Sequence, residues 1–383
     1  MKAFDSIKHW ETEIRRRASS LLLRTWYPPP DSKGPCAALM PFLHWAERLY
    51  ALGLRRDQER ARKRCRALPA YVVSLGNLTT GGTGKTPMAL WLAKHLHDAG
   101  WKTAILSRGY GRKKDSVSRV PSEGPTLPLV ERFGDEPVLM ARKMPATPVW
   151  VGRDRFRSGE AAIRKHQAQI LILDDGFQHL RLKRNLDLLL LDTHDPFGNG
   201  ALIPLGPLRE PIESISRAHA VLLTRADDPE RSGKTRRYLR EKFPGKPIYS
   251  CRHRTVRLRQ GLAGPVLSRE HFQHKPAVAF AGIARPEAFF ESLRRLGVRL
   301  SRCLGFPDHA PYGNAEKALL MTAVREANAH FLITTEKDYV RLPAGLQSIV
   351  VTTELAVDFG EEEAAFLQFL EAKIAEEKPG MPL

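Results

Sequence analysis

Lys85 and Thr86 are the residues whose surroundings point most directly to chemistry. They close the stretch Gly81-Gly82-Thr83-Gly84, and an apolar, β-branched run precedes it at residues 71–75. Glycines let backbone N–H groups turn toward an anion, and a helix that starts there adds partial positive charge. We therefore predict that Gly81 to Thr86 bind nucleotide phosphates. Lys85 would reach the β- and γ-phosphates, and the Thr86 hydroxyl would ligate Mg²⁺.

The stretch departs from the strict phosphate-loop pattern at one position, because Thr79 stands where a glycine is usual. A flexible glycine turn that happens to precede Lys-Thr is the alternative interpretation. The neighbouring elements favour the phosphate loop. An apolar strand comes before it, and an amphipathic helix that starts near Met88 and is closed by Gly100 comes after it.

Carboxylates fall where predicted strands end, at Asp135-Glu136, Asp174-Asp175 and Asp192/Asp195. Ligands of an open α/β sheet bind beyond the carboxyl ends of its strands, so these groups should meet near the phosphate loop. Asp174 and Asp175 follow the run Ile-Leu-Ile-Leu as a Walker B-like pair, which would hold Mg²⁺ directly or through water. An aspartate after a strand is also a common turn device, so that alternative stays open.

Phosphoryl transfer to a hydroxyl needs a base near the attacking oxygen and cations on the developing charge. Asp135 is a candidate base, and His309 could relay its proton. Arg155 and Arg209 could clamp a substrate phosphate, and Gln178 and His179 are candidates on the substrate side. The alternatives are structural hydrogen bonds for the histidines and surface salt bridges for the arginines.

The elements that must position these groups alternate between strands and helices, which predicts a doubly wound, mostly parallel α/β sheet. We expect strands at 71–75, 103–107, 149–152, 169–175, 186–192 and 221–224. A second, smaller α/β unit should begin at residue 277, with strands at 331–335 and 348–352 and an acidic helix at 361–377. The predicted segments are an N-terminal extension (1–66), a P-loop domain (67–228), a charged, irregular linker (229–275) and a C-terminal α/β domain (276–383).

The composition predicts an anionic partner, because the formal net charge is +19. Nucleic acid, an acidic membrane face and a phosphorylated substrate are the three candidates. The four cysteines form no Cys-x-x-Cys pair, which indicates reduced thiols in a cytoplasmic compartment and no zinc site. No apolar stretch has the length to cross a bilayer, and the N-terminus lacks the apolar core of a signal peptide.

Residues 37–54 are apolar with interfacial aromatic residues, and they run directly into a basic cluster between Arg55 and Arg66. This pattern is typical of a helix that lies in a membrane interface above anionic lipid. A helix packed on its own domain, with a solvated basic face, is the alternative.

Several motifs together resemble the tetraacyldisaccharide 4′-kinase family of lipid A biosynthesis. In chain order they are Gly76-Asn-Leu-Thr-Thr-Gly-Gly-Thr-Gly-Lys-Thr-Pro87, Ser107-Arg-Gly-Tyr110, Gly134-Asp-Glu-Pro137, Asp174-Asp-Gly-Phe-Gln-His179, Pro207-Leu-Arg-Glu210, Ala281-Gly-Ile283, Asp308-His309 and Thr335-Glu-Lys-Asp338. The resemblance runs from about residue 35 to 355. The first thirty or so residues look longer than the family's usual start, and the C-terminal helix carries no matching motif.

The resemblance implies a P-loop kinase that transfers the γ-phosphate of ATP to the 4′-hydroxyl of a tetraacylated disaccharide 1-phosphate, giving lipid IV A. It implies a monotopic enzyme on the cytoplasmic face of the inner membrane, with Mg²⁺ as cofactor and no evident protein partner. Asp135 matches the family's catalytic carboxylate and His309 its supporting histidine. Glu136 and Thr86 match the magnesium neighbourhood, and Arg155 and Arg209 match groups near the lipid's phosphate and sugar.

Two other classes of protein share some of these features. A membrane-associated ATPase switch of the MinD or partition type also carries Gly-Gly-x-Gly-Lys-Thr, but its signature lysine is replaced here by Thr80. A nucleic-acid-binding protein would explain the charge. However, the sequence has no helix-turn-helix, zinc ligands or RNP aromatics, so we expect no nucleic-acid partner.

Overall fold

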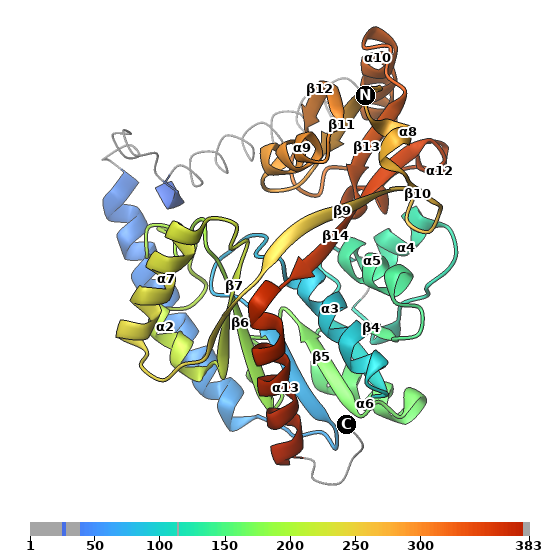
Figure 1. Cartoon of the computed structure of the whole chain (residues 1–383). Helices are drawn as coiled ribbons and strands as arrows, with labels where there is room; N and C mark the ends of the chain where they lie inside the picture. Colours follow the sequence, from blue (N-terminus) through green and yellow to red (C-terminus); the bar gives the residue numbers. More distant parts are fainter. Residues whose placement is uncertain (1–24, 28–38, 113–114, 378–383) are drawn as a thin grey trace, which may run out of the picture.

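The apolar run at Tyr71 forms β1 (Tyr71–Gly76), the central strand of an eight-stranded sheet in the computed structural model (Figure 1). The structure describes residues 25–27, 39–112 and 115–377, so most of the predicted extension before residue 39 lies outside the described residues. The strand order is β3-β4-β2-β5-β1-β6-β7-β8, and all pairs are parallel except β3 with β4. We call this sheet and the helices packed on it the first unit.

The other strands of this sheet lie close to the predicted positions. They are β2 (Thr103–Ser107), β3 (Ser118–Arg119), β4 (Val149–Val151), β5 (Ile170–Asp174), β6 (Leu186–Asp192), β7 (Ala220–Thr224) and β8 (Ile248–Ser250). Strands β1, β2, β5, β6 and β7 are buried along their whole length. A parallel sheet covered on both faces requires such continuous apolar runs, which is why the sequence revealed these strands.

Helices cover both faces of the first sheet. They are α3 (Lys85–Asp98), α4 (Thr126–Phe133), α5 (Asp135–Lys143), α6 (Arg155–His166) and α7 (Pro229–Lys242), with the 3₁₀ turn η2 (Ile212–Arg217). Residues of α3 and α5 pack on one face of the central strands, and those of α6 pack on the other. The doubly wound fold class predicted from the sequence is therefore confirmed.

The second unit is built on a six-stranded sheet with the order β10-β9-β14-β13-β11-β12. Its strands are β9 (Arg252–Gln260), β10 (Val266–Leu267), β11 (Pro276–Ala281), β12 (Arg299–Gly305), β13 (Phe331–Thr335) and β14 (Val350–Asp358). Its helices are α8 (Arg269–Phe272), α9 (Pro286–Arg295), α10 (Asn314–Glu326), α11 (Glu336–Tyr339) and α12 (Ala344–Gln347). Strands β11 to β14 pair in parallel, and β9 and β10 add an antiparallel edge.

The segment 229–275 is not the irregular linker that we expected. It contains helix α7, the edge strand β8 of the first sheet, and strands β9 and β10 of the second. Strand β9 pairs with β14 from Arg252↔Asp358 to Gln260↔Val351, and this long ribbon connects the two units (Figure 1). The basic residues that suggested a loop alternate along β9, where a half-exposed strand can carry them.

The C-terminal helix also departs from the predicted boundaries. After the turn η3 (Gly360–Glu362), α13 (Glu363–Glu377) returns to the first unit rather than staying with the second (Figure 1). Phe366, Leu370 and Ile374 are buried in the core that contains Tyr71. The Tyr71 hydroxyl also donates to the Lys373 carbonyl at 2.9 Å. The acidic side of α13 faces outward, so its charge concealed an apolar stripe.

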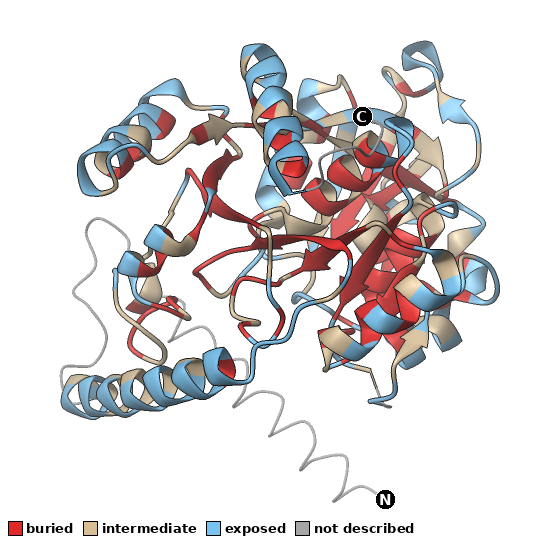
Figure 2. Cartoon of the chain, turned by 90° about the horizontal axis from the view of Figure 1, so that it is seen from below, coloured by how far each residue is buried: buried red, intermediate tan, exposed pale blue. Residues whose placement is uncertain are grey.

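Helix α2 (Met40–Lys63) confirms the predicted N-terminal helix and lies along the first unit with most of its surface exposed (Figure 2). Its polar contacts are made by Glu47, Tyr50 and Gln58, which bond to Leu202 N, Arg209 O and the Glu210 carboxylate. The opposite face exposes an apolar stripe, formed by Phe42, Trp45, Leu49 and Leu52. Within the described ranges, no helix is both long and apolar enough to span a bilayer.

Candidate active site

The glycine-rich loop lies at the carboxyl edge of the first sheet, where β1 is flanked by β5 and β6 and the strand order reverses. A doubly wound sheet binds its ligands at this switch point. Gly84 has a φ of +84° and is followed directly by α3, which begins at Lys85. A Cβ on Gly84 would lie 1.9 Å from the His253 ring, so only glycine fits there. The loop and the helix N-terminus therefore form the predicted arrangement for an anion.

Asn77 organises the side chains beside this loop. Its amide oxygen accepts from Lys85 Nζ at 3.1 Å and also from the Arg209 guanidinium. Its backbone carbonyl accepts from Gln178 Nε2 at 2.9 Å. Asp175 completes the set, at 2.9 Å from Arg209 and 3.5 Å from Lys85. Lys85, Gln178 and Arg209 thus meet at one point, although they are far apart in the sequence.

Asp174 and Asp175 differ sharply in their electrostatic surroundings. Burial, together with the charges of Glu136 and Asp175, raises the pKa of Asp174 to about 7. The carboxyl of Asp174 accepts one hydrogen bond, from Ser107 Oγ at 3.0 Å. For Asp175, the charges of Lys85 and Arg209 outweigh burial and hold its pKa well below the ordinary value. Asp175 is therefore a stable carboxylate, whereas Asp174 ionises only at a cost.

The side chains predicted to bind Mg²⁺ are suited in type and charge to this cation. Among the described side chains, no three histidines, cysteines or acids form a ready-made metal cluster. Mg²⁺ in nucleotide sites needs only one or two carboxylates, because phosphates and water complete its shell. Glu136 and Asp175 both raise the pKa of Asp174, which means that negative charge is in excess around it. A bound cation would relieve that repulsion.

Asp135 is the first residue of α5 and is 7% exposed. The Nδ1 atom of His309, from the second unit, lies 2.8 Å from its carboxylate. Arg341, also from the second unit, lies 3.8 Å from the same oxygen. Burial would raise the pKa of Asp135. The hydrogen bond from His309 and the nearby charges of His309, Lys337 and Arg341 outweigh it and lower that pKa.

His309 has a left-handed backbone, with a φ of +59°, in the loop between β12 and α10. The hydrogen bond with Asp135 raises its pKa, whereas burial and the charge of Lys337 oppose that shift. Lys337 Nζ lies 3.4 Å from His309 Nε2 and 3.3 Å from Asp308. The two units therefore meet at a carboxylate–histidine pair.

The two predicted substrate arginines have different surroundings, because Arg155 is buried whereas Arg209 forms an ion pair with Asp175. Arg155 is 5% exposed at the start of α6, and its guanidinium donates to Arg153 O at 3.1 Å. Burial lowers the pKa of Arg155 to about 10, against the opposing charges of Asp174 and Asp175. Arg209 is paired with Asp175 and Asn77 beside the phosphate loop. Whether either arginine contacts substrate stays a prediction.

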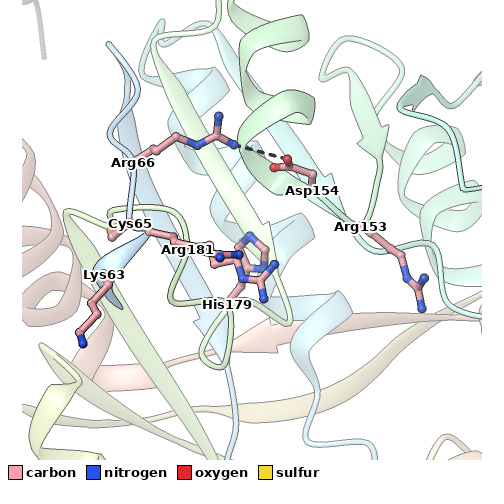
Figure 3. A pocket seen from close by; sticks show the side chains of 8 residues that line it. Lys63, Cys65, Arg66, Arg153, Asp154, His179 and Arg181 are labelled. Atoms are coloured by element: carbon pink, nitrogen blue, oxygen red, sulfur yellow. Dashed lines mark hydrogen bonds and ion pairs between the residues drawn. The ribbon is translucent and has the colours of Figure 1, made fainter. Parts of the chain in front are cut away.

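A basic cavity of about 540 Å³ lies between the end of α2 and the loops after β4 and β5 (Figure 3). Asp154 is its single acidic residue, and Arg66 lies 3.4 Å from that carboxylate. His179 lines the cavity with a buried Nε2 atom that has no hydrogen-bond partner. Burial, reinforced by the charge of Arg155, lowers the pKa of His179 to about 4. Five cations line the cavity: Lys63, Arg64, Arg66, Arg153 and Arg181.

Sequence reasoning missed several residues that shape this site. Asn77 and Ser107 lie within motifs of the family resemblance, but their residue types did not predict their partners. Asn77 bonds to Lys85 and Arg209, and Ser107 bonds to Asp174. Lys337 and Arg341, near the end of β13, were also missed. A signal did exist for Lys337, because its motif Thr335-Glu-Lys-Asp338 falls where a parallel strand ends.

A phosphate loop at a sheet switch point, beside paired carboxylates and a carboxylate–histidine pair, defines the class of P-loop phosphotransferases. The family model described as tetraacyldisaccharide-1-P 4′-kinase matches residues 37–375. The chain therefore belongs to the tetraacyldisaccharide 4′-kinase family, and it is a kinase of lipid A biosynthesis. The resemblance found in the sequence is confirmed.

The similarity to known proteins extends over most of the chain. The tetraacyldisaccharide 4′-kinase of Syntrophobacter fumaroxidans is 46% identical over 358 residues, which cover 93% of each chain. That of Desulfatibacillum aliphaticivorans is 42% identical and covers 80% of this chain and 84% of its own. The crystal structure of LpxK from Aquifex aeolicus in complex with ATP matches with a TM-score of 0.66 and 29% identity. It covers 88% of this chain and 98% of that one.

Proposed function

We propose that the protein transfers the γ-phosphate of ATP to the 4′-hydroxyl of a tetraacyldisaccharide 1-phosphate, giving lipid IV A. The observation that carries this proposal is the Asp135–His309 pair, 2.8 Å apart, contributed by two different units. A base of this kind suits a hydroxyl acceptor. We propose ATP as the phosphoryl donor because the related LpxK of Aquifex aeolicus was crystallised in complex with it.

In the proposed reaction, Asp135 accepts the proton of the sugar hydroxyl as that oxygen attacks the γ-phosphorus. The bond between the γ-phosphorus and the β-bridging oxygen breaks, and ADP leaves. His309 holds the Asp135 carboxylate in place, and Lys85 with the amides of Gly81 to Gly84 neutralises charge on the transferring group. Thr86, Glu136, Asp174 and Asp175 would hold Mg²⁺, which supplies further neutralisation of phosphate charge.

We propose that the basic cavity receives the 1-phosphate at the other end of the disaccharide. Five cations against one carboxylate favour a dianion, and the buried Nε2 of His179 has a free hydrogen-bonding position. Gln178 and Arg155 would then lie between this end and the reacting end. Arg181→Ala should raise the KM for the natural acceptor and leave that for an acceptor without the 1-phosphate unchanged. An equal effect on both acceptors would exclude this role.

We propose that α2 places the enzyme on the cytoplasmic face of the inner membrane. Its exposed stripe is apolar from Phe42 to Leu52, and the same face continues with Arg56, Arg60 and Lys63. An apolar stripe next to basic residues favours an anionic lipid interface. Serine at Phe42, Trp45, Leu49 and Leu52 should abolish flotation with anionic vesicles. Unchanged flotation would assign membrane binding to another part of the chain.

The proposed reaction is tested with labelled ATP and detergent-dispersed tetraacyldisaccharide 1-phosphate. Wild type should label the acceptor, and Lys85→Ala should not. Asp135→Asn should lower kcat by roughly 10²- to 10⁴-fold, the usual share of a positioned base. ATP hydrolysis that does not depend on the acceptor would instead favour an ATPase switch.

A further inference from the structure

Lys337 lies at the centre of the contact between the two units, on the short helix α11. Its ammonium is 3.5 Å from Glu136, 3.3 Å from Asp308 and 3.4 Å from His309 Nε2. Its side chain is 24% exposed. It therefore touches both neighbours of the Asp135–His309 pair, one from each unit. The reaction described above gives Lys337 no role.

The helix that carries Lys337 is rigidly anchored in the second unit. The next residue, Asp338, is fully buried and accepts from the Tyr312 hydroxyl at 2.7 Å and from Gly282 N at 3.0 Å. Arg341 pairs with Asp338 and donates to the carbonyl of Ala310 at 3.1 Å. A side chain on such a support reaches the other unit without a large loss of conformational entropy.

We call the surroundings of Asp135 and His309, where the acceptor hydroxyl would bind, the acceptor side. The charges of its side chains show why a cation is needed there. Asp135, Glu136 and Asp308 bring three carboxylates together, while the charge of Arg341 is balanced by Asp338. A phosphoryl group that arrives with its own negative charge would be repelled by this cluster. Lys337 is the cation that faces it, and His309 adds positive charge only when its ring is protonated. Lys85 lies beside the phosphate loop instead, where it contacts Asn77 and Asp175.

We propose that Lys337 is a positioning residue for phosphoryl transfer, through which the second unit supplies positive charge to the acceptor side. It holds Glu136 and the Asp308-His309 turn together, so that Asp135 faces the acceptor hydroxyl only when the two units are in contact. This inference rests on the proposed function and adds a group to its site. It makes catalysis, rather than substrate binding, depend on the second unit.

A neighbouring pair provides a matched control. Lys143 Nζ lies 2.6 Å from Glu336, so this pair also joins α5 to α11, but neither residue touches Asp135 or His309. If Lys337 only fastened the units together, Lys143→Met and Lys337→Gln would impair the enzyme in the same way. If Lys337 positions the reacting groups, only Lys337→Gln should affect the chemical step.

The test compares kcat and KM of the full chain for ATP and for the lipid acceptor. Lys337→Gln should lower kcat by about 10²-fold, the cost of misplacing reacting groups by roughly 1 Å, with both KM values unchanged. Lys337→Arg should recover most of kcat because it keeps the charge, and Lys143→Met should stay near wild type. Unfolding temperatures check that each variant is folded.

Three outcomes would overturn the inference: a normal kcat in Lys337→Gln, an equal loss in Lys143→Met, or no recovery in Lys337→Arg while the protein stays folded. Wild type that fails to phosphorylate the acceptor would reject the proposed function itself, which separates the two failures.

Discussion

At the scale of single residues, Asp174 and Asp175 are neighbours in the chain, yet the pKa values of their carboxyl groups are shifted in opposite directions. Asp174 is 3% exposed and has Ser107 as its hydrogen-bond partner, and burial and like charges raise its pKa to about 7. Asp175 points toward Lys85 and Arg209, whose charges lower its pKa. One residue therefore costs stability in the free protein, and the other contributes to it.

Asp174→Asn should stabilise the metal-free, nucleotide-free protein at neutral pH. At about pH 3 the carboxyl is mostly protonated in both the folded and the unfolded chain, so wild type and variant should agree. As the pH rises to 7, only the unfolded chain ionises readily, and the free energy of unfolding of wild type falls. The variant avoids this loss. Its Tm should exceed that of wild type at pH 8 by on the order of 5 °C.

Asp175→Asn is the matched control, since it should lower the Tm at pH 8 by leaving Lys85 and Arg209 without their carboxylate. Scanning calorimetry of both variants at about pH 3 and pH 8 checks the prediction. A Tm change of the same sign in both variants would contradict the electrostatic difference between the two residues.

His309 should carry a pKa above the ordinary value of about 6.5 in wild type, because its hydrogen bond with Asp135 stabilises the charged ring. Asp135→Asn removes that carboxylate and leaves burial and the charge of Lys337, which favour the neutral ring, against the smaller effect of Asp308. The His309 pKa should therefore fall in the variant. An NMR titration of the His309 Cε1 proton, assigned with His309→Gln, measures it. Equal values in the two proteins would exclude the hydrogen bond in solution.

The residues of the phosphate loop could be predicted because their chemistry is local. The proposed anion site of Gly81 to Thr86 is a short stretch of backbone, and neighbouring residues specify it. The partners of Arg209 could not be found in this way, because Asn77 and Asp175 are distant in sequence. Likewise, the residues alone offered His309 as a partner of Asp135 but left a structural hydrogen bond as the alternative, and the family resemblance favoured the pairing.

At the scale of elements, the turn from β1 into α3 is the most constrained part of the fold. Gly84 combines a left-handed backbone with a contact that leaves no room for a Cβ. Gly82 has neither constraint, since no neighbouring atom would lie within 4 Å of its Cβ. The two glycines are two positions apart in the same loop. Substitutions at the two positions can therefore distinguish the effect of backbone strain from an effect on the chemistry of the loop.

Gly84→Ala should lower the free energy of unfolding by more than about 2 kcal/mol, the sum of a left-handed alanine and a clash with His253. Gly82→Ala should change it by less than about 0.5 kcal/mol. His253→Ala in the Gly84→Ala background should recover the steric part alone. Urea unfolding measures all three. Equal stability of the two alanine variants would show that the turn differs from the one described.

Strands buried on both faces were predictable, and the half-exposed strands β9 and β12 were not. Strands β1, β5 and β6 are continuous apolar runs, so their sequences identify them. Strand β9 has the sequence Arg-His-Arg-Thr-Val-Arg-Leu-Arg-Gln, and β12 is exposed at a sheet edge. Their strand structure depends on pairing with β14 and β11, which are distant segments. Tertiary partners, rather than local propensity, decide such strands.

At the scale of the whole molecule, two units contribute to the proposed catalytic centre. The first carries the phosphate loop and Asp135. The second carries His309, 174 positions further along the chain, and Lys337, the proposed positioning residue. The β9–β14 ribbon spans the two units, and α13 returns to the first (Figure 1). Relative movement of the units would open or assemble the acceptor side, as in enzymes that close over their substrates.

Asp135 and His309 should act as one unit across this contact. A double-mutant cycle with Asp135→Asn, His309→Gln and the double variant, measured as kcat for phosphorylation of the lipid acceptor, tests whether they do. Groups that act together are not additive, so the double variant should lose little more activity than Asp135→Asn alone. If the two losses multiply in the double variant, the residues work independently, and the account is contradicted.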